Sequence, residues 1–252
     1  MGGATPLPTK TATMTTIKVI GSSSKANGYI ITSNNAQLIV ELGCDFNKYL
    51  EALNYDTMLV SGCISSHCHT DHLNPTTAKK IAHLGLTIYG NKSVAQAANG
   101  IALQPKKNYK IGAFTVNGFP LQHRAENFGY IITCPDGTRI LFATDAKCIP
   151  YRFKNINVYM IEANHDDETV IENMAKEEPM YNRFNDHMGI EDCIAFLDQS
   201  FPLGSCRYIL LIHPSSLNAR PSEYIRQIKE RYGIESVDVA QAGMVVDVTE
   251  NF

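Results

Sequence analysis

The residues best suited to chemistry in this chain lie in one short run, His67-Cys68-His69-Thr70-Asp71-His72. Three imidazoles and a carboxylate within six residues would crowd titratable groups together with no benefit to an ordinary fold. Imidazole and carboxylate together are ligands that zinc and similar divalent metals prefer in proteins. The run therefore predicts a metal centre.

Three further residues of the same kind occur far along the chain, each just after a hydrophobic run. His123 follows residues 116–121, Asp145 follows residues 139–144, and His213 follows residues 208–212. The first motif likewise follows the apolar run 57–65. A single histidine or aspartate after a strand is usually a turn or surface residue. Because loops at the carboxyl ends of strands converge in α/β sheets, the recurrence indicates that these side chains meet in one site.

The hydrophobic pattern predicts strands and helices that interleave along one domain. Strands are expected at 17–20, 29–32, 37–41, 57–65 and 86–90, and again at 157–162, 208–212, 237–239 and 244–248. Between them the segment 109–144 alternates strand patterns and turns, with strands that include 116–121 and 139–144. Helices are expected at 46–54, 76–84, 92–98, 166–176, 189–199 and 221–232. Pro135-Asp136-Gly137 is typical of a hairpin turn, and the polar stretch 176–187 is expected to be a mobile loop.

The bulk properties exclude some classes of protein. The 252 residues carry a net charge of −3, which does not indicate a nucleic-acid coat or a membrane-surface binder. No run approaches the roughly 18 apolar residues of a membrane-spanning helix, so no membrane partner is expected. Seven cysteines without a C-x-x-C pair favour reduced thiols in the cytoplasm over a disulfide framework. We expect residues 1–14 to be a disordered leader and residues 15–252 to form one domain.

The order His-x-His-x-Asp-His, followed by a distant His, Asp and His, resembles the metallo-β-lactamase superfamily over most of the chain. The resemblance implies an α/β fold, a four-layer αββα sandwich of two mixed sheets with helices outside, and two divalent metal ions. It assigns His67, His69 and His123 to one metal, and Asp71, His72 and His213 to the other, with Asp145 bridging both. Zinc is the metal expected first, although such ligands also accept manganese or iron.

Two departures from the true β-lactamases narrow this resemblance. The common zinc enzymes of that group have a cysteine at the position of Asp145 and lack a histidine like His72 after the motif aspartate. Antibiotic hydrolysis is therefore not expected. Glyoxalase II, lactonases, phosphodiesterases and nucleases are the branches that combine Asp-His with a bridging aspartate.

The last third of the chain resembles ribonuclease Z in three segments: 161–164 (Ile-Glu-Ala-Asn), 187–189 (His-Met-Gly) and 211–215 (Leu-Ile-His-Pro-Ser). The resemblance implies that His187, assisted by Glu162, protonates the leaving oxygen, although Met-Gly stands here in place of Ser-Thr. Only the 21 residues 124–144 separate His123 from Asp145, too few for the arm with which that enzyme grips tRNA. The chain is closer to small armless bacterial and phage relatives, and armless relatives are often homodimers. Maturation of tRNA ends is therefore not expected.

We expect a metal-dependent phosphodiesterase that acts on a nucleotide or nucleic acid, either a cyclic nucleotide or the ends of DNA or RNA. An activated water would attack phosphorus in line, oriented or deprotonated by Asp71 or Asp145, and His187 would protonate the leaving oxygen. The negative net charge favours a small substrate, because a long polyanion normally requires a basic track. The alternative is an ester, thioester or lactone hydrolase with the same metals, in which His187 would be dispensable.

Three further features have two interpretations each. His165 either orients a ligand or is a helix-start histidine near Asp166. The loop Ser22–Ser24 either binds phosphate through backbone N–H groups or forms a simple turn. Arg124 and Lys147, each close in sequence to a predicted ligand, either offer positive charge to a phosphate or have no part in the site.

Overall fold

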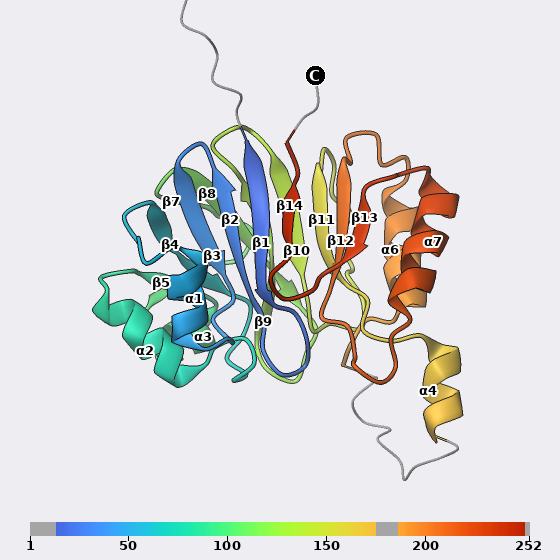
Figure 1. Cartoon of the computed structure of the whole chain (residues 1–252), viewed down its shortest axis with the longest axis horizontal. Helices are drawn as coiled ribbons and strands as arrows, with labels where there is room; N and C mark the ends of the chain where they lie inside the picture. The colour runs from blue at the N-terminus through green and yellow to red at the C-terminus, as the bar shows by residue number, and fades with distance from the viewer. Residues whose placement is uncertain (1–13, 175–185, 250–252) are drawn as a thin grey trace, which may run out of the picture.

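The computed structural model describes residues 14–174 and 186–249. Within them, two seven-stranded sheets pack face to face, with helices on their outer faces (Figure 1). The expected leader, apart from Met14, lies outside the described residues, and so does most of the expected loop 176–187.

The first sheet contains seven strands in the order β14-β1-β2-β3-β4-β5-β6. Their bounds are β1 (Thr15–Gly21), β2 (Gly28–Ser33), β3 (Ala36–Val40), β4 (Val60–Ser65), β5 (Ile88–Gly90), β6 (Ile101–Ala102) and β14 (Val245–Asp247). Neighbours from β14 to β3 are antiparallel, and neighbours from β3 to β6 are parallel. The sheet is therefore mixed.

The second sheet follows the order β13-β12-β11-β10-β9-β8-β7. Its strands are β7 (Asn108–Ile111), β8 (Phe114–Leu121), β9 (Asn127–Thr133), β10 (Arg139–Ala143), β11 (Val158–Glu162), β12 (Tyr208–Ile212) and β13 (Val237–Val239). The strands β7 to β10 form an antiparallel meander, and β10 to β13 are parallel. This sheet is mixed as well.

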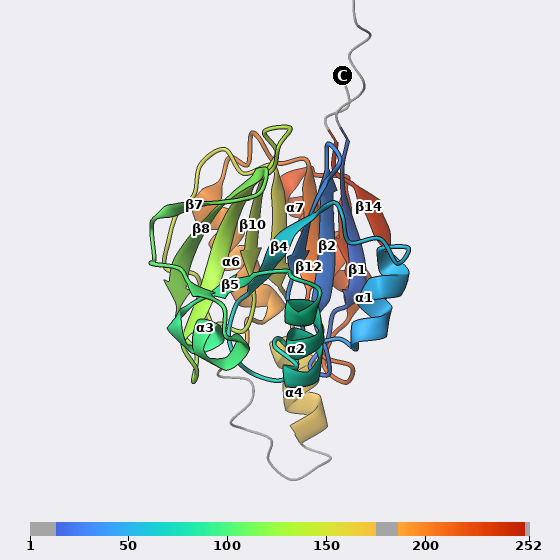
Figure 2. The same cartoon turned by 90° about the vertical axis from the view of Figure 1, so that its left-hand side faces the viewer.

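Six helices lie in the described part of the chain. They are α1 (Phe46–Ala52), α2 (Pro75–His83), α3 (Lys92–Ala98), α4 (Asp167–Met174), α6 (Ile190–Ser200) and α7 (Pro221–Tyr232). Helices α1 to α3 cover the first sheet, as Figure 2 shows from their side, and α6 and α7 cover the second sheet. The expected αββα sandwich is confirmed.

Alternation along the strands explains the four layers. Leu38 of β3 and Phe142 of β10 point between the sheets and belong to one central core. Their chain neighbours Ile39 and Leu141 point outward, into the cores beneath α1–α3 and α6–α7 respectively. Because successive side chains of a strand face opposite sides, each buried strand can be apolar on both faces. The near-continuous apolar runs of the sequence are therefore strands covered on both sides.

Local signals set the helix ends. The Asn74 side chain accepts hydrogen bonds from the backbone N–H groups of Thr76 and Thr77, and Pro75 occupies the first turn of α2. Gly233 adopts the left-handed conformation that ends α7, at a φ of 67°. These signals explain why α2 begins, and α7 ends, within a residue of the predicted bounds.

Two predictions about strands were inaccurate. The strand expected at 57–65 begins only at Val60, because Thr57 accepts a turn hydrogen bond from the N–H of Val60 and Met58 is 88% exposed. The two-residue β6 was missed, since both its residues are exposed and carry no hydrophobic period. All seven cysteines are free. Among the described helices none is long and apolar enough to cross a membrane.

A buried hydroxyl joins the two sheets beside the first motif. Tyr130 of β9 donates a hydrogen bond of 2.6 Å from its hydroxyl to the carbonyl oxygen of Ser65, the last residue of β4. Both residues are fully buried. The bond fixes the end of β4 immediately before Ser66 and His67.

Replacing Tyr130→Phe should therefore lower the free energy of unfolding by about 1–3 kcal/mol, because a buried acceptor loses its donor. Urea unfolding followed by circular dichroism measures the change. The matched control is Tyr55→Phe, since Tyr55 is 72% exposed and its substitution should change stability little. Equal stability of the two variants would contradict a role for the Tyr130 hydroxyl.

Candidate metal centre

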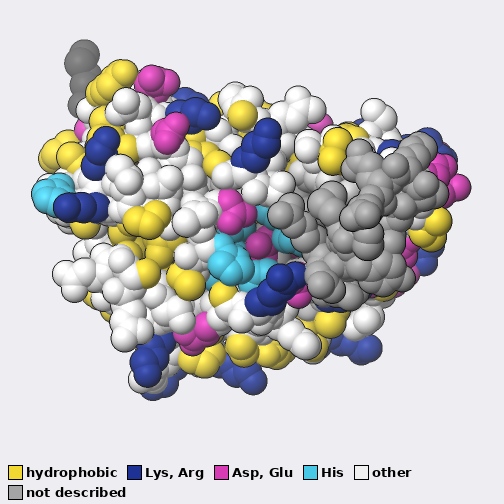
Figure 3. Space-filling view, turned by 90° about the horizontal axis from the view of Figure 1, so that it is seen from below, with side chains coloured by type: hydrophobic (Ala, Val, Ile, Leu, Met, Phe, Trp, Pro, Cys, Tyr) yellow, Lys and Arg dark blue, Asp and Glu magenta, His cyan; other side chains and the backbone are white. Residues whose placement is uncertain are grey.

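Histidine and acidic side chains gather in a hollow on the face seen in Figure 3, where strands of both sheets end. The run His67–His72 follows β4 of the first sheet. His123, Asp145 and His213 come within two residues of the ends of β8, β10 and β12 of the second sheet. Each sheet thus supplies part of one site, as the sequence predicts.

Three residues of the site lie on strained backbone. The φ angles of Glu41, Asp145 and His213 are 64°, 53° and 57°, in the left-handed region. This region costs a non-glycine residue of the order of 1–3 kcal/mol and persists where the surroundings impose it. Each of the three side chains contacts a histidine or aspartate of the hollow. The chain therefore takes up left-handed conformations at three points where it turns into the site.

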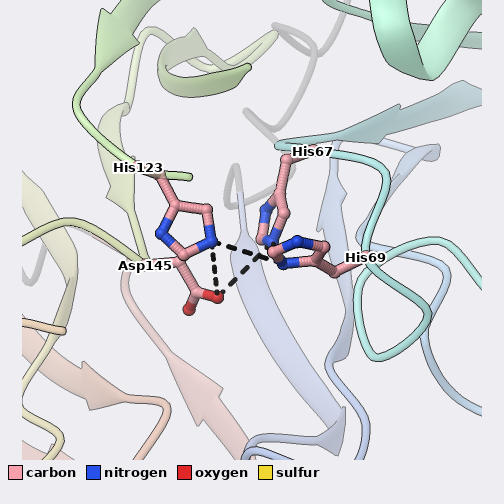
Figure 4. A group of neighbouring side chains, drawn as sticks. All are labelled: His67, His69, His123 and Asp145. Carbon is pink, nitrogen blue, oxygen red and sulfur yellow. Dashed lines mark hydrogen bonds and ion pairs between the residues drawn. The ribbon is translucent and has the colours of Figure 1, made fainter. Parts of the chain in front are cut away.

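The first group of converging side chains comprises His67, His69, His123 and Asp145 (Figure 4). Nε2 of His67 lies 2.9 Å from Nδ1 of His69, and Nε2 of His123 lies 3.3 Å from the same Nδ1. Oδ2 of Asp145 lies 3.4 Å from Nε2 of His67. One ligand atom from each residue lies within 4.8 Å of the others, so the four side chains can contact one ion.

The second group comprises Asp71, His72 and His213, again with Asp145. Nε2 of His72 lies 3.2 Å from Oδ2 of Asp71 and 3.3 Å from Oδ2 of Asp145. Nε2 of His213 lies 3.7 Å from Oδ2 of Asp71. The structure thus brings together all seven residues to which the resemblance assigns metals, in the two expected sets.

Asp145 lies between the two groups. Its Oδ2 lies 3.4 Å from Nε2 of His67 and 3.3 Å from Nε2 of His72, whereas Oδ1 lies 3.4 Å from Nδ1 of His213 and accepts a hydrogen bond from the Thr144 hydroxyl. Burial would raise the pKa of the Asp145 carboxyl, but the facing His213 and His72 side chains hold it well below its usual range. The carboxyl group is therefore ionised, as a metal ligand must be.

The donor set fits a divalent metal. Burial and the neighbouring His72 lower the pKa of His67 well below its ordinary value, which keeps that ring neutral as ligation requires. Nε2 of His213 is buried, and it has no hydrogen-bond partner within the described ranges 14–174 and 186–249. Imidazole nitrogens with carboxylate oxygens suit zinc, manganese and iron. The cluster therefore has the composition and geometry of a divalent-metal site.

Glu41 supports this site and was missed in the sequence. Its side chain is fully buried, with Oε2 at 3.3 Å from Nδ1 of His72. The backbone N–H of Ser66 donates to Oε1, and the Ser65 hydroxyl donates to Oε2. A carboxylate behind a metal-binding histidine fixes the ring and its tautomer. The available signal was a lone charge directly after the apolar strand β3.

His187 and Glu162 lie beside the second group. Nδ1 of His187 is 2.8 Å from Oε1 of Glu162, which also lies 3.0 Å from Nδ1 of His213. The rings of His187 and His213 stack at 5.2 Å. Burial alone would lower the pKa of His187, but the Glu162 carboxylate raises it above its ordinary value. His187 therefore carries a proton readily near neutral pH.

Glu162, His187, His213 and Asp145 also have the spacing of metal ligands. However, Oε2 of Glu162 accepts hydrogen bonds from the backbone N–H groups of Met188 and Ala146, and Oε1 faces both imidazoles. Its four contacts are those of a carboxylate that orients its neighbours. We therefore interpret Glu162 as a positioning residue.

The Ser22–Ser24 loop has a structural part in the site. The Ser22 hydroxyl accepts a hydrogen bond from the backbone N–H of His213, and the Ser23 N–H donates to the Asn27 side chain. The Asn27 amide in turn donates to the carbonyl oxygen of Asp71. The loop therefore holds the ends of the two sheets together, and these groups are already engaged within the protein.

His165 and the two cations contact other protein groups. Nδ1 of His165 lies 3.3 Å from the amide oxygen of Asn164, whose nitrogen donates to the carbonyl oxygen of His213. Arg124 forms an ion pair with Asp186, and Lys147 forms one of 2.6 Å with Asp192. The charges of both cations are thus partly compensated by neighbouring carboxylates.

Comparisons with solved structures identify the fold. The chain superposes on the metallo-β-lactamase fold protein YhfI from Bacillus subtilis with a TM-score of 0.69 and 18% identity, over 93% of this chain and 99% of that one. A diphosphatase of the PhnP family gives a TM-score of 0.68 and 11% identity, over 93% of this chain and 97% of that one. The short form of human tRNase Z gives a TM-score of 0.59 and 13% identity, over 93% of this chain and 100% of that one.

No protein-family model matches the sequence, and no curated protein matches it significantly. The structural similarities, at 11–18% identity, establish the fold. The chain has the metallo-β-lactamase fold, with a histidine and aspartate cluster at the end of the sandwich.

The contacts of Glu41 generate a test of the site. Replacing Glu41→Gln keeps the shape of the side chain but removes the charge facing His72, so metal affinity should fall by about 10–100-fold. Competition with a chromophoric chelator measures the affinity. Glu51→Gln, on the exposed face of α1, is the matched control and should leave affinity unchanged. Unchanged affinity in both variants would exclude this role for Glu41.

Metal binding should also depend on pH. Burial would lower the pKa of His213, but the facing carboxylates of Asp145, Asp71 and Glu162 raise it to about 10. A ligating imidazole must be neutral, so a metal ion has to displace this proton. Affinity for Zn²⁺ should therefore fall as the pH falls from about 9 to about 6, with protons released on binding. Calorimetry in buffers of different ionisation enthalpy measures both quantities, and an affinity independent of pH would be contrary to expectation.

Proposed function

We propose that this protein is a metal-dependent phosphodiesterase that acts on a nucleotide or nucleic acid. In this proposal His67, His69 and His123 would hold one divalent metal, Asp71, His72 and His213 would hold a second, and Asp145 would be shared by both sets. Zinc is the first choice of metal, with manganese and iron compatible. Bound metals would supply Lewis acidity and positive charge opposite the oxygens of a phosphoryl group.

The observation that carries the proposal is the pairing of His187 with Glu162. Nδ1 of His187 faces Oε1 of Glu162 at 2.8 Å, so Nε2 is the nitrogen that delivers a proton. The ring lies beside the cluster, with Nδ1 3.8 Å from Oδ1 of Asp145, and its side chain is 18% exposed. A protonated imidazole in this position suits a reaction whose leaving oxygen is strongly basic. Breaking a nucleotide P–O bond is such a reaction.

The other side chains of the site have complementary roles in this proposal. Asp71 or Asp145, both ionised, would orient the attacking water or accept its proton. Glu162 holds His187 in place and stabilises its imidazolium form. The structural neighbours include a diphosphatase and a tRNase Z, whose names indicate chemistry on phosphate groups.

Among phosphodiesters, a small nucleotide is the preferred substrate. The segment between His123 and Asp145 consists of β9, β10 and short turns, so it offers no arm to grip a folded RNA. The net charge of −3 likewise favours a small substrate over a long polyanion. We place the protein in the cytoplasm, since its seven free cysteines fit a reducing compartment.

The His187→Ala substitution tests the proposal. It should lower kcat on a cyclic mononucleotide by roughly 10²–10⁴-fold, because the leaving alkoxide loses its proton donor. On bis-p-nitrophenyl phosphate the loss should be small, because p-nitrophenolate leaves without a proton. Metal content, measured by elemental analysis, should not change. Glu162→Gln should follow the same pattern more weakly.

The control for that experiment is His83→Ala on the exposed end of α2, which should leave kcat unchanged on both substrates. Equal losses on both substrates would indicate that His187 binds metal or supports the structure. Wild-type protein that hydrolyses a thioester or lactone but neither phosphodiester would overturn the proposal in favour of the ester-hydrolase alternative.

A further inference from the structure

A groove of about 580 Å³ adjoins the metal centre on the side of the turn between β8 and β9. We call it the β8–β9 groove and define it by Ala102, Leu103, Pro105, Leu121 and Phe128. Its lining also includes His123, which belongs to the first group of converging side chains. A molecule held at the cluster can therefore extend directly into the groove.

Hydrogen bonds within the protein hold the walls of the groove. The N–H of Leu103 donates to the carbonyl oxygen of Gly90, and the N–H of Lys106 donates to that of Gly118, both at 2.7 Å. The N–H of Phe128 donates to the carbonyl oxygen of Ser66, next to His67. The groove is thus built on the same strand ends as the site, and it needs no rearrangement to exist.

The chemistry of the groove is divided between floor and rim. Leu103, Leu121 and Phe128 form an apolar floor and are 3–7% exposed. The exposed amide side chains of Gln104 and Gln122 stand above it.

Two cations, Lys92 and Arg124, lie at the rim. The one carboxylate in the lining, that of Glu126, accepts hydrogen bonds from the N–H and hydroxyl of Ser93. Arg124 pairs with Asp186, so Lys92 is the rim cation that we assign to an anionic group of the ligand.

We infer that the β8–β9 groove binds the nucleoside that carries the scissile phosphate. The inference rests on the proposed function, since a phosphate at the metal centre places its organic substituent beside His123. An apolar floor that includes the ring of Phe128 suits the face of an aromatic base, amides suit its polar edge, and Lys92 suits any further phosphate. The volume lies within the range of about 300–1,000 Å³ typical of small-molecule sites. The groove thereby determines specificity for nucleotides over other phosphodiesters.

The first test fills the groove with Ala102→Trp and compares two substrates with the same leaving group. The kcat/KM for thymidine 5′-(p-nitrophenyl phosphate) should fall about tenfold or more, because its base can no longer enter. The kcat/KM for methyl p-nitrophenyl phosphate should stay within about twofold, because a methyl group does not reach the groove. The matched control, Ala97→Trp, adds the same ring at an exposed position of α3 outside the groove and should change neither value.

The second test uses binding instead of turnover and changes only the surface. Lys92→Glu should weaken binding of thymidine 3′,5′-bisphosphate, which has a second phosphate outside the metal centre, by about three- to tenfold, while binding of inorganic phosphate stays the same. Lys107→Glu, an exposed lysine outside the groove, is the matched charge reversal and should affect neither ligand. Calorimetry on the metal-loaded protein measures both ligands.

The outcomes separate this inference from the proposed function. If the wild-type protein hydrolyses neither p-nitrophenyl ester, the phosphodiesterase assignment itself fails. If it hydrolyses both, and Ala102→Trp and Lys92→Glu affect the nucleoside and the small ligand equally or not at all, the groove does not bind the nucleoside. A selective loss for the nucleoside ligands in both variants supports the assignment.

Discussion

The constraint on which this structure depends is the convergence of five imidazoles and two carboxylates in one hollow. Groups with this much charge and so many lone pairs repel one another unless protons or metal ions lie between them. Asp145 is central, because its Oδ2 lies 3.4 Å from one set of ligands and 3.3 Å from the other. A single buried carboxylate thus requires the ends of the two sheets to meet at the site.

The rest of the sandwich holds these ends in register. Tyr130 joins β9 to the end of β4, and Ser22 of the first sheet's loop accepts a hydrogen bond from the backbone of His213. Glu41 and Glu162 lie behind His72 and His213 respectively. Polar groups this deeply buried are costly unless they are paired, so the network both orients the ligands and specifies how the sheets pack.

The open side of the hollow differs from this rigid interior. His187 lies beside the cluster, where the Glu162 carboxylate raises the pKa of its ring. The β8–β9 groove begins at His123. In the proposed function the buried side holds the metals, His187 supplies a proton and the groove selects the substrate. Substrate choice can then change through surface residues such as Lys92 without disturbing the ligands.

The amino-acid sequence by itself indicated the seven candidate ligands, and its resemblance to the metallo-β-lactamase superfamily implied the four layers, the two ligand sets and the pairing of His187 with Glu162. Four apolar runs of strand length are each followed by a histidine or aspartate, and that pattern can be read from local sequence alone. The pairing of Glu41 with His72 could not be predicted. Glu41 lies 31 residues before His72 (72 − 41), and whether its carboxylate reaches that ring depends on the register of β3 and β4.

Tertiary structure alone decided that Oδ2 of Asp145 lies close to both groups, that Arg124 and Lys147 are engaged by carboxylates, and that a groove opens beside His123. The physical reason is that each of these features joins separate segments of the chain. Spacing along a sequence says which side chains can do chemistry, but distances between them are set only when the two sheets pack.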